Sequence, residues 1–191
     1  MGVVAERKRF TVDEYHKLGQ AGVLTEDDRI ELIEWELIQM PPIGSVHAGM
    51  VGRLDHAFQA GVRKSFVVWT QNPLSLPPGS EPQPDLSLLK PREDDYLNSL
   101  PTASDVLLVI EVADTTLAYD RDVKIPLYAK QGIAESWLLD VKARRLEMHR
   151  DPGPYGYRNL LRPGRDESVS PLALPNVKID LKALFAGLPA G

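Results

Sequence analysis

The sequence predicts an α/β (α+β) fold in which a mixed central sheet is flanked by helices, and three observations support this prediction. Leu86–Leu89, Val106–Val112 and Ser136–Asp140 are apolar runs of strand length, which is typical of strands buried in a sheet. From Val46 to Lys64, apolar residues recur every three or four positions, the period of an amphipathic helix. Val106–Val112 is the most apolar run and is therefore expected at the centre of the sheet.

Length and composition are those of a single globular domain. The chain has 191 residues, of which 43% are hydrophobic and 26% charged, and it is long enough to bury a sizeable core. We expect one domain over residues 1–191, with residues 1–9 as a flexible tail. The formal net charge of −5 does not by itself indicate a nucleic-acid binder, although a local basic face can coexist with a negative total.

The absence of cysteine narrows the chemistry and suggests a compartment. With no cysteine, disulfide bonds and thiolate catalysis are excluded, which fits a reducing cytoplasm. The first residues, MGVVAERKRF, are too polar for a secretory signal, and no apolar run approaches the length of a membrane span. We therefore expect a cytoplasmic protein without a membrane segment.

Two elements are predicted before the long helix. Thr11 followed three residues later by Glu14 has the spacing of a capping box, so a helix is expected to start there and to end near Gly19 or Gly22. In Arg29–Met40, RIELIEWELIQM, apolar and polar residues alternate on both sides of a short polar break. This alternation favours a half-buried hairpin; a helix is the competing interpretation.

The second half of the chain supplies the remaining elements. Proline is costly inside a helix but fits its first turn, so Pro126 predicts a helix from near Lys124 to Gly132. An antiparallel strand pair is expected after it, formed by Leu146–His149 and Tyr155–Leu161 and joined by a turn at Asp151-Pro152-Gly153. The chain is then expected to end in a short helical cap, Asp180–Phe185.

Two acids and a lysine form the most informative pattern of the chain. Asp85 follows Pro84 at the start of one predicted strand, and Glu111 lies near the end of another, where an acid is unusual. Mg²⁺ prefers hard oxygen ligands such as one or two carboxylates, and the carbonyl of Val112 could add a third. Lys124 could orient or deprotonate a water, or offset phosphate charge, so these residues could together hydrolyse a phosphodiester.

The same residues also allow a purely structural interpretation. Lys124 could form an ion pair with Glu111 or Asp120, and Asp85 could do no more than cap a loop. Spacing alone favours neither interpretation, because structural ion pairs share these residue types.

A family resemblance adds to this pattern. Pro84-Asp85, then an acid on an apolar strand, then a lysine, resembles the PD-(D/E)XK nuclease superfamily. More closely, IEVADTTLAYDRDVKIPLYAKQGIAESWLLD is similar to the Uma-two family of restriction-endonuclease-like proteins. FTVDEYHKL, the IELIEWELIQM segment and His47 also resemble that family, so the similarity covers nearly the whole chain.

The resemblance implies a restriction-endonuclease-like fold with an N-terminal β-hairpin, and an endonuclease that uses Mg²⁺, or Mn²⁺ as a substitute, to cut DNA. Asp85, Glu111 and Val112 would hold the metal. Ala113 stands where the superfamily has its lysine, so Lys124 would be the catalytic lysine that has migrated to the next helix. The resemblance also implies a homodimer, because members of the superfamily commonly dimerise. The alternative is a nucleic-acid-binding or dimerising module that keeps the fold without catalysis.

Further residues are candidates or depart from the family pattern. Asp114 and Ser136 stand where the family has a serine and a tyrosine, and Trp35 stands where it has a glycine in the hairpin turn. Beyond these departures, Glu31 is a candidate for a further acid of the site, and His47 is a candidate for a contact with substrate phosphate. Asp120 and Tyr128 could orient Lys124. A basic rim could be formed by Arg144, Arg145 and Arg150.

Overall fold

The structure is a computed structural model that describes residues 6–59 and 65–189. It divides into two compact units, Met1–Pro42 with Ser75–Pro82 (the N-terminal unit) and Ile43–Leu74 with Gln83–Gly191 (the sheet unit). The first part of the predicted tail and the predicted end of the long helix, residues 1–5 and 60–64, lie outside the described residues. The one-domain organisation stays a prediction.

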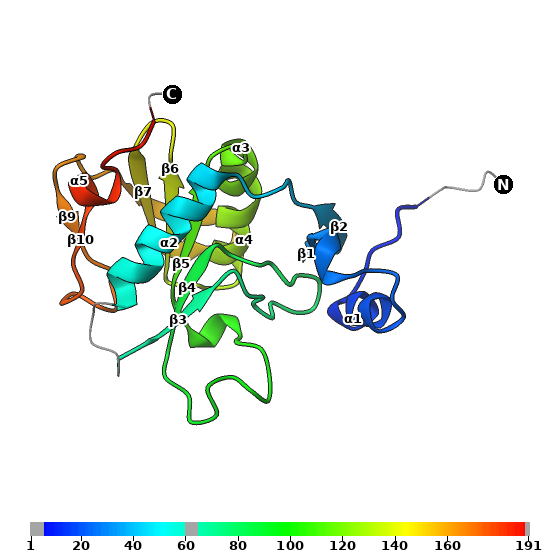
Figure 1. The fold of residues 1–191 in the computed structure, drawn as a ribbon. Helices are drawn as coiled ribbons and strands as arrows, with labels where there is room; N and C mark the ends of the chain where they lie inside the picture. Colours follow the sequence, from blue (N-terminus) through cyan, green and yellow to red (C-terminus); the bar gives the residue numbers. More distant parts are fainter. Residues whose placement is uncertain (1–5, 60–64, 190–191) are drawn as a thin grey trace. The chain divides into compact units, whose positions relative to one another are not determined.

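The N-terminal unit begins with the predicted helix, α1 (Val12–Gln20), which Figure 1 shows in blue. The capping box is formed, because the Glu14 N–H donates to Thr11 Oγ1 at 3.2 Å and the Thr11 N–H donates to Glu14 Oε2 at 3.0 Å. This reciprocal pair satisfies donors that the first helical turn leaves open.

A β-hairpin follows after the short turn η1 (Glu26–Asp28), so the alternation signal was correct and the helical alternative was wrong. Strands β1 (Ile30–Ile33) and β2 (Glu36–Gln39) pair antiparallel. Glu34 and Trp35 have φ angles of 46° and 68°, a left-handed turn that favours glycine. The backbone N–H of Trp35 donates to the Gly79 carbonyl at 2.7 Å. The Trp35 ring lies against Gly79 where the Cβ atom of any other residue would be.

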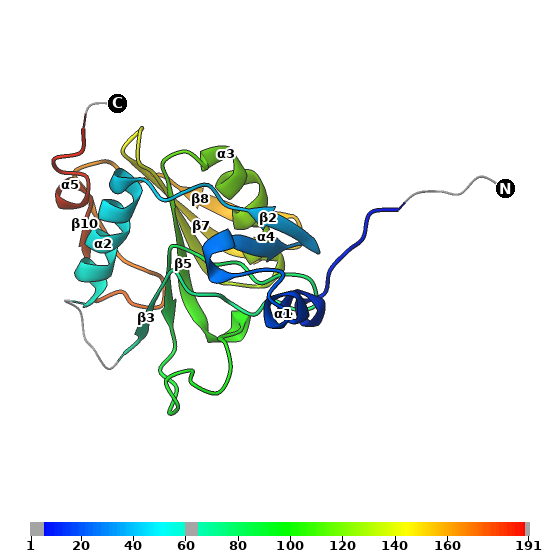
Figure 2. The same cartoon turned by 45° about the vertical axis from the view of Figure 1, so that its right-hand side comes forward.

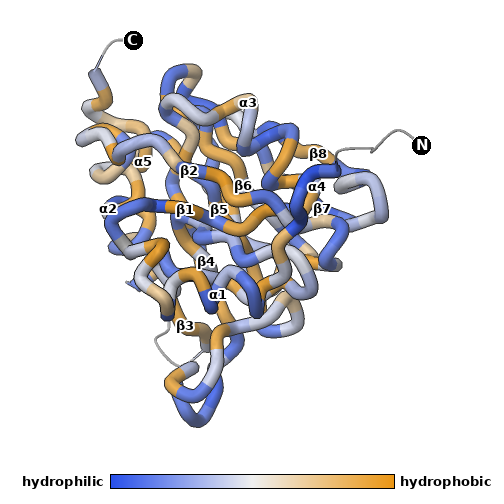
Figure 3. Tube along the Cα trace, turned by 90° about the vertical axis from the view of Figure 1, so that its right-hand side faces the viewer, coloured by the Kyte–Doolittle hydropathy of each residue, from blue (hydrophilic) through white to orange (hydrophobic). Residues whose placement is uncertain are grey.

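The sheet unit contains a six-stranded mixed sheet in the order β3-β4-β5-β6-β7-β8. Its strands are β3 (Val67–Thr70), β4 (Leu86–Leu89), β5 (Val106–Ala113), β6 (Glu135–Asp140), β7 (Arg145–Gly153) and β8 (Gly156–Leu161). Only β5 and β6 pair parallel, and every other neighbouring pair is antiparallel. The sequence predicted this mixed sheet and the central place of β5. Figure 3 shows the chain trace coloured by hydropathy.

Helices cover both faces of this sheet (Figure 1; Figure 2). One face carries α2 (Ser45–Gln59) and α5 (Leu181–Leu184), next to the small ladder of β9 (Ser168–Val169) and β10 (Ile179–Asp180). The other face carries the β5–β6 crossover, which consists of α3 (Leu117–Tyr119), the π-helical turn η3 (Asp120–Lys124) and α4 (Ile125–Lys130). A parallel strand pair requires such a crossover.

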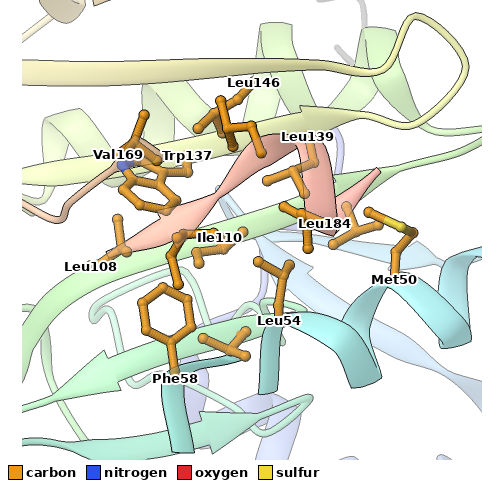
Figure 4. Close-up of a cluster of buried hydrophobic side chains, with 14 of the residues drawn as sticks. Met50, Leu54, Phe58, Leu108, Ile110, Trp137, Leu139, Leu146, Val169 and Leu184 are labelled. Atoms are coloured by element: carbon orange, nitrogen blue, oxygen red, sulfur yellow. The ribbon is translucent and has the colours of Figure 1, made fainter. Parts of the chain in front are cut away.

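The main apolar core lies between α2 and the sheet. Figure 4 shows Leu54 and Phe58 of α2 facing Ile110 of β5 and Trp137 of β6. All four are at most 1% exposed, and burying a side chain of this size contributes about 1.5–3 kcal/mol. The apolar residues of β5 on this face alternate with residues on the other face, and this alternation directs Glu111 to the crossover side.

Two local predictions need correction. The predicted helix near Lys124 is present as α4, but the helical segment that contains it already begins at Leu117. The predicted turn at Asp151-Pro152-Gly153 is wrong, because β7 continues through Gly153. The strand β3, at Val67–Thr70, pairs with β4. In the crossover, the N–H of Ile125 donates to the carbonyl of Asp120, five residues earlier. This wider turn immediately precedes Pro126, so the chain stays helical where an α-helical turn would meet the proline ring.

Candidate active site

Asp85 lies at the rim of the sheet because proline ends the strand ladder. The register pairs Leu86 with Ile110, which places Pro84 opposite Val112. Proline has no N–H and cannot complete that pair. The Asp85 carboxylate takes its place, and Oδ2 accepts the Val112 N–H at 2.8 Å. The carboxylate is therefore fixed against β5.

Glu111 and Asp85 lie at the same end of two paired strands. The β4–β5 register ends at the Leu86–Ile110 pair, and Asp85 and Glu111 are the next residues beyond it, where like charges close together are destabilising. The Asp85 side chain is 14% exposed and the Glu111 side chain 3%. Two neighbouring acids in such a setting need cations close by.

Lys124 supplies one of these cations. Its Nζ lies 3.2 Å from Glu111 Oε1, and its side chain is 2% exposed. The same Oε1 accepts a hydrogen bond from the hydroxyl of Tyr128, on α4. Lys124 and Tyr128 thus meet at Glu111, and their roles in catalysis stay predictions.

His47 is a second basic group at the acids. It lies in the first turn of α2, and its Nε2 is 3.0 Å from Asp85 Oδ1. The sequence suggested a contact between His47 and substrate phosphate, whereas the structure shows a contact with the carboxylate. Asp85 is thus held from two sides, by the Val112 N–H and by the His47 ring.

The donors at this rim fit a hard divalent cation. Two carboxylates lie at this rim, and the Val112 carbonyl points toward the same strand edge as its N–H, where Pro84 offers no N–H to it. Carboxylate and carbonyl oxygens are the ligands that Mg²⁺ and Mn²⁺ accept, with waters and phosphate completing the shell. No cluster of three or more His, Cys, Asp or Glu side chains with metal-site geometry occurs in residues 6–59 and 65–189.

The other candidate residues have contacts of their own. Asp120 accepts from the Thr116 hydroxyl at 2.5 Å. Arg150 is tied to Glu135 at 2.7 Å, and Arg144 donates to the Leu188 carbonyl at 2.9 Å. The predicted basic rim of Arg144, Arg145 and Arg150 stays a prediction. Glu31 pairs with Ile38 within the N-terminal hairpin, and its contribution to the site stays a prediction.

Sequence reasoning missed a second charged cluster on the crossover face. Glu147 of β7 accepts from Arg121 Nε at 3.1 Å and from Arg162 Nε at 3.0 Å. Burial raises the pKa of the Glu147 carboxyl, but the hydrogen bonds from both arginines outweigh it and leave the pKa below its ordinary value. The local sequence gives no signal of this cluster, because Glu147 alternates with the apolar residues Leu146 and Met148 as a solvent-facing strand residue would.

Comparisons with known proteins place the chain in a family. Among the described residues, no helix is long and apolar enough to cross a membrane. The comparison with curated proteins found no match to the chain. A crystal structure described as a "putative nuclease belonging to DUF820 from Anabaena variabilis ATCC 29413" matches with a TM-score of 0.73 and 20% identity. The match covers 93% of this chain and 98% of that one, and it shows a shared fold. Residues 12–182 match the model of the Uma2 family, described as "Putative restriction endonuclease", and the chain therefore belongs to the Uma2 family.

Proposed function

We propose that this protein is an endonuclease that hydrolyses phosphodiester bonds of DNA with Mg²⁺, or with Mn²⁺ as a substitute. The observation that carries the proposal is that Asp85 and Glu111 directly follow the last β4–β5 pair, with Lys124 Nζ 3.2 Å from Glu111. Membership of a family described as nucleases supports the reaction class. DNA as substrate follows from the superfamily resemblance.

Asp85, Glu111 and the carbonyl of Val112 would hold the metal. Bound there, the ion would act as a Lewis acid on the phosphate and lower the pKa of a water that attacks it. The protein contributes prearranged ligands, because Asp85 is fixed by the Val112 N–H at 2.8 Å and by His47 at 3.0 Å. Ligands fixed in this way need no reorganisation when substrate binds.

Lys124 would act on the phosphate or on the water. Its ammonium group would offset the negative charge that develops on the transferred phosphoryl group. Tyr128 and Lys124 both contact Glu111 Oε1, so this carboxylate is held in one orientation. Homodimerisation and cytoplasmic location stay predictions from the sequence.

A non-catalytic module is the second candidate, and one observation favours it. The side chains of Glu111 and Lys124 are 3% and 2% exposed, as expected of a structural ion pair that stays in the protein interior. In that case the site would bind no metal and the protein would bind nucleic acid without cutting it.

Mn²⁺ titration and plasmid cleavage separate the two candidates. The calorimetric titration compares wild type with Asp85→Asn, and Asp122→Asn on the exposed side of η3 serves as a charge-matched control. We expect saturable Mn²⁺ binding and nicking by wild type and the control. Asp85→Asn should lose Mn²⁺ binding, and its cleavage rate should be about 10²–10³-fold lower than that of wild type. Equal cleavage by Asp85→Asn, or none by wild type with either metal, would contradict the proposal.

A further inference from the structure

The second charged cluster lies in line with the candidate active site. The strand register pairs Glu111 with Leu138 and Leu138 with Glu147, so the two glutamates lie on the same sheet face, two strands apart. Neighbouring strands are about 4.8 Å apart, which separates the two positions by about 10 Å. Arg121 and Lys124 belong to the same turn, η3. One helical segment therefore supplies a cation to each glutamate.

Glu147 orients two arginines at the protein surface. Its side chain is 1% exposed, whereas those of Arg121 and Arg162 are 37% and 51% exposed. Arg121 contacts the carboxylate through Nε, and Arg162 contacts it through Nε and Nη2, both at 3.0 Å. A guanidinium carries more N–H groups than these contacts use, so each arginine retains donors, and both side chains are partly exposed.

The cluster carries a surplus positive charge. Two arginines meet one carboxylate, and the lowered pKa of Glu147 keeps this carboxylate ionised near neutral pH. His149, whose Nε2 lies 3.7 Å from Glu147, has its pKa lowered by burial and adds no charge there. By contrast, buried Glu135 is neutralised by one arginine, Arg150. At Glu147, one of the two positive arginine charges is therefore not neutralised by the carboxylate.

We propose that Arg121 and Arg162, oriented by Glu147, bind a phosphate of the substrate strand close to the one that is cut. This inference rests on the proposed function and adds to it the surface along which the strand runs. Successive phosphates of one strand lie 3.4 Å apart along the duplex axis, so a span of about 10 Å reaches a phosphate within about three nucleotides. Arginine forks match the oxygens of phosphate in geometry as well as in charge.

The test measures DNA binding without cleavage. A short fluorescein-labelled duplex is titrated with wild type, Arg121→Gln and Arg162→Gln in EDTA, and fluorescence anisotropy gives Kd between about 50 and 200 mM salt. Glutamine can still donate a hydrogen bond to Glu147, and urea unfolding verifies that each variant is folded. Arg158→Gln is the matched control, because Arg158 is on β8 but pairs with exposed Asp151 at 3.2 Å.

We expect each of Arg121→Gln and Arg162→Gln to weaken binding roughly five- to ten-fold near 0.1 M salt. Each should also reduce the slope of log K against log salt by about 0.9, the value of one lost phosphate contact. Arg158→Gln should leave the slope unchanged. Slopes for Arg121→Gln and Arg162→Gln equal to that of Arg158→Gln would overturn the inference.

Failure of the proposed function gives a different result. If wild type binds DNA in a way that depends on Arg121 and Arg162 but cuts no DNA with Mg²⁺ or Mn²⁺, the phosphate site stands and catalysis is refuted. If wild type cuts DNA and both arginine variants bind normally, catalysis stands and the phosphate site is refuted. If wild type does not bind DNA at all, the phosphate site is refuted together with DNA as substrate.

Discussion

Glu111 and Glu135 are both buried acids on neighbouring central strands, but their surroundings differ. Glu135 Oε1 accepts from Trp137 Nε1 and Arg150 Nε, both at 2.8 Å, and Oε2 accepts from the Leu172 N–H. Its donors come from three parts of the chain and both oxygens are engaged. This is the arrangement of a buried charge that stabilises structure.

Glu111 is placed against a like charge instead. Its Oε1 contacts Tyr128 and Lys124, and Asp85 follows the last β4–β5 pair at the same end of the sheet. Like charges close together lower stability unless a cation offsets them. The comparison teaches that burial of an acid does not by itself distinguish a structural ion pair from the proposed metal site, and that the neighbouring acid is the difference to test.

The largest expected effect is on cleavage by Glu111→Gln. The amide keeps the shape of the side chain and its contact with Tyr128 but removes the proposed metal ligand and the negative charge next to Lys124. We expect the cleavage rate, measured on supercoiled plasmid, to fall about 10³-fold. Residual cleavage close to wild type would mean that Glu111 resembles Glu135 and that the comparison fails.

Glu135→Gln tests the other side of the comparison through stability. It removes the charge that neutralises Arg150 in a fully buried position, and breaking such a pair costs about 3–5 kcal/mol. Urea unfolding should show this loss, while the cleavage rate per folded molecule stays at the wild-type value. A large loss of cleavage by fully folded Glu135→Gln would assign this residue to the site as well.

Tyr128→Phe should have an intermediate effect, because Tyr128 contacts the proposed metal ligand but not the metal. The hydroxyl donates to Glu111 Oε1 and is completely buried. Loss of such an outer contact typically lowers metal affinity or activity about 10–100-fold. Mn²⁺ titration measures this change. Tyr157→Phe, which loses a buried hydroxyl bonded to Ser136 at 2.7 Å, is the control and should leave Mn²⁺ affinity unchanged.

The sequence was sufficient where local chemistry decides the structure. The capping box of Thr11 and Glu14 depends on residues three apart, and it formed as predicted. The Arg29–Met40 alternation gave the hairpin, and the apolar run Leu86–Leu89 coincides with β4. In each case the deciding interactions lie within a few residues along the chain or follow directly from a two-residue period.

The sequence was insufficient where pairing or packing between distant segments decides. Nothing local to Asp85 and Glu111 predicts that the β4–β5 register brings them to the same end of two paired strands. Pro126 suggested a helix start, but the π-helical turn before it lets the helix begin at Leu117. Glu147 lies between Leu146 and Met148 and has the pattern of an exposed strand position. It is buried because the crossover covers that face.

The smallest expected effect is the pH dependence of stability that Glu147 adds. Its carboxyl has a lower pKa in the folded protein than the ordinary 4.5, because hydrogen bonds from Arg121 and Arg162 outweigh the opposing effect of burial. The folded state therefore binds this proton more weakly than the unfolded state does. The resulting stabilisation is fully present above pH 4.5 and is lost as the pH falls through the lowered folded pKa.

Urea unfolding of wild type and Glu147→Gln between about pH 3 and 7 measures this contribution. The stability difference between the two proteins should be constant near neutral pH and shrink toward the acid end. Glu93→Gln, at an exposed position of the long loop after β4, should change stability by less than about 0.5 kcal/mol at neutral pH. A difference for Glu147→Gln that did not shrink in acid would mean that the arginines do not hold Glu147 as a charged group, and would remove the support it gives to the phosphate site.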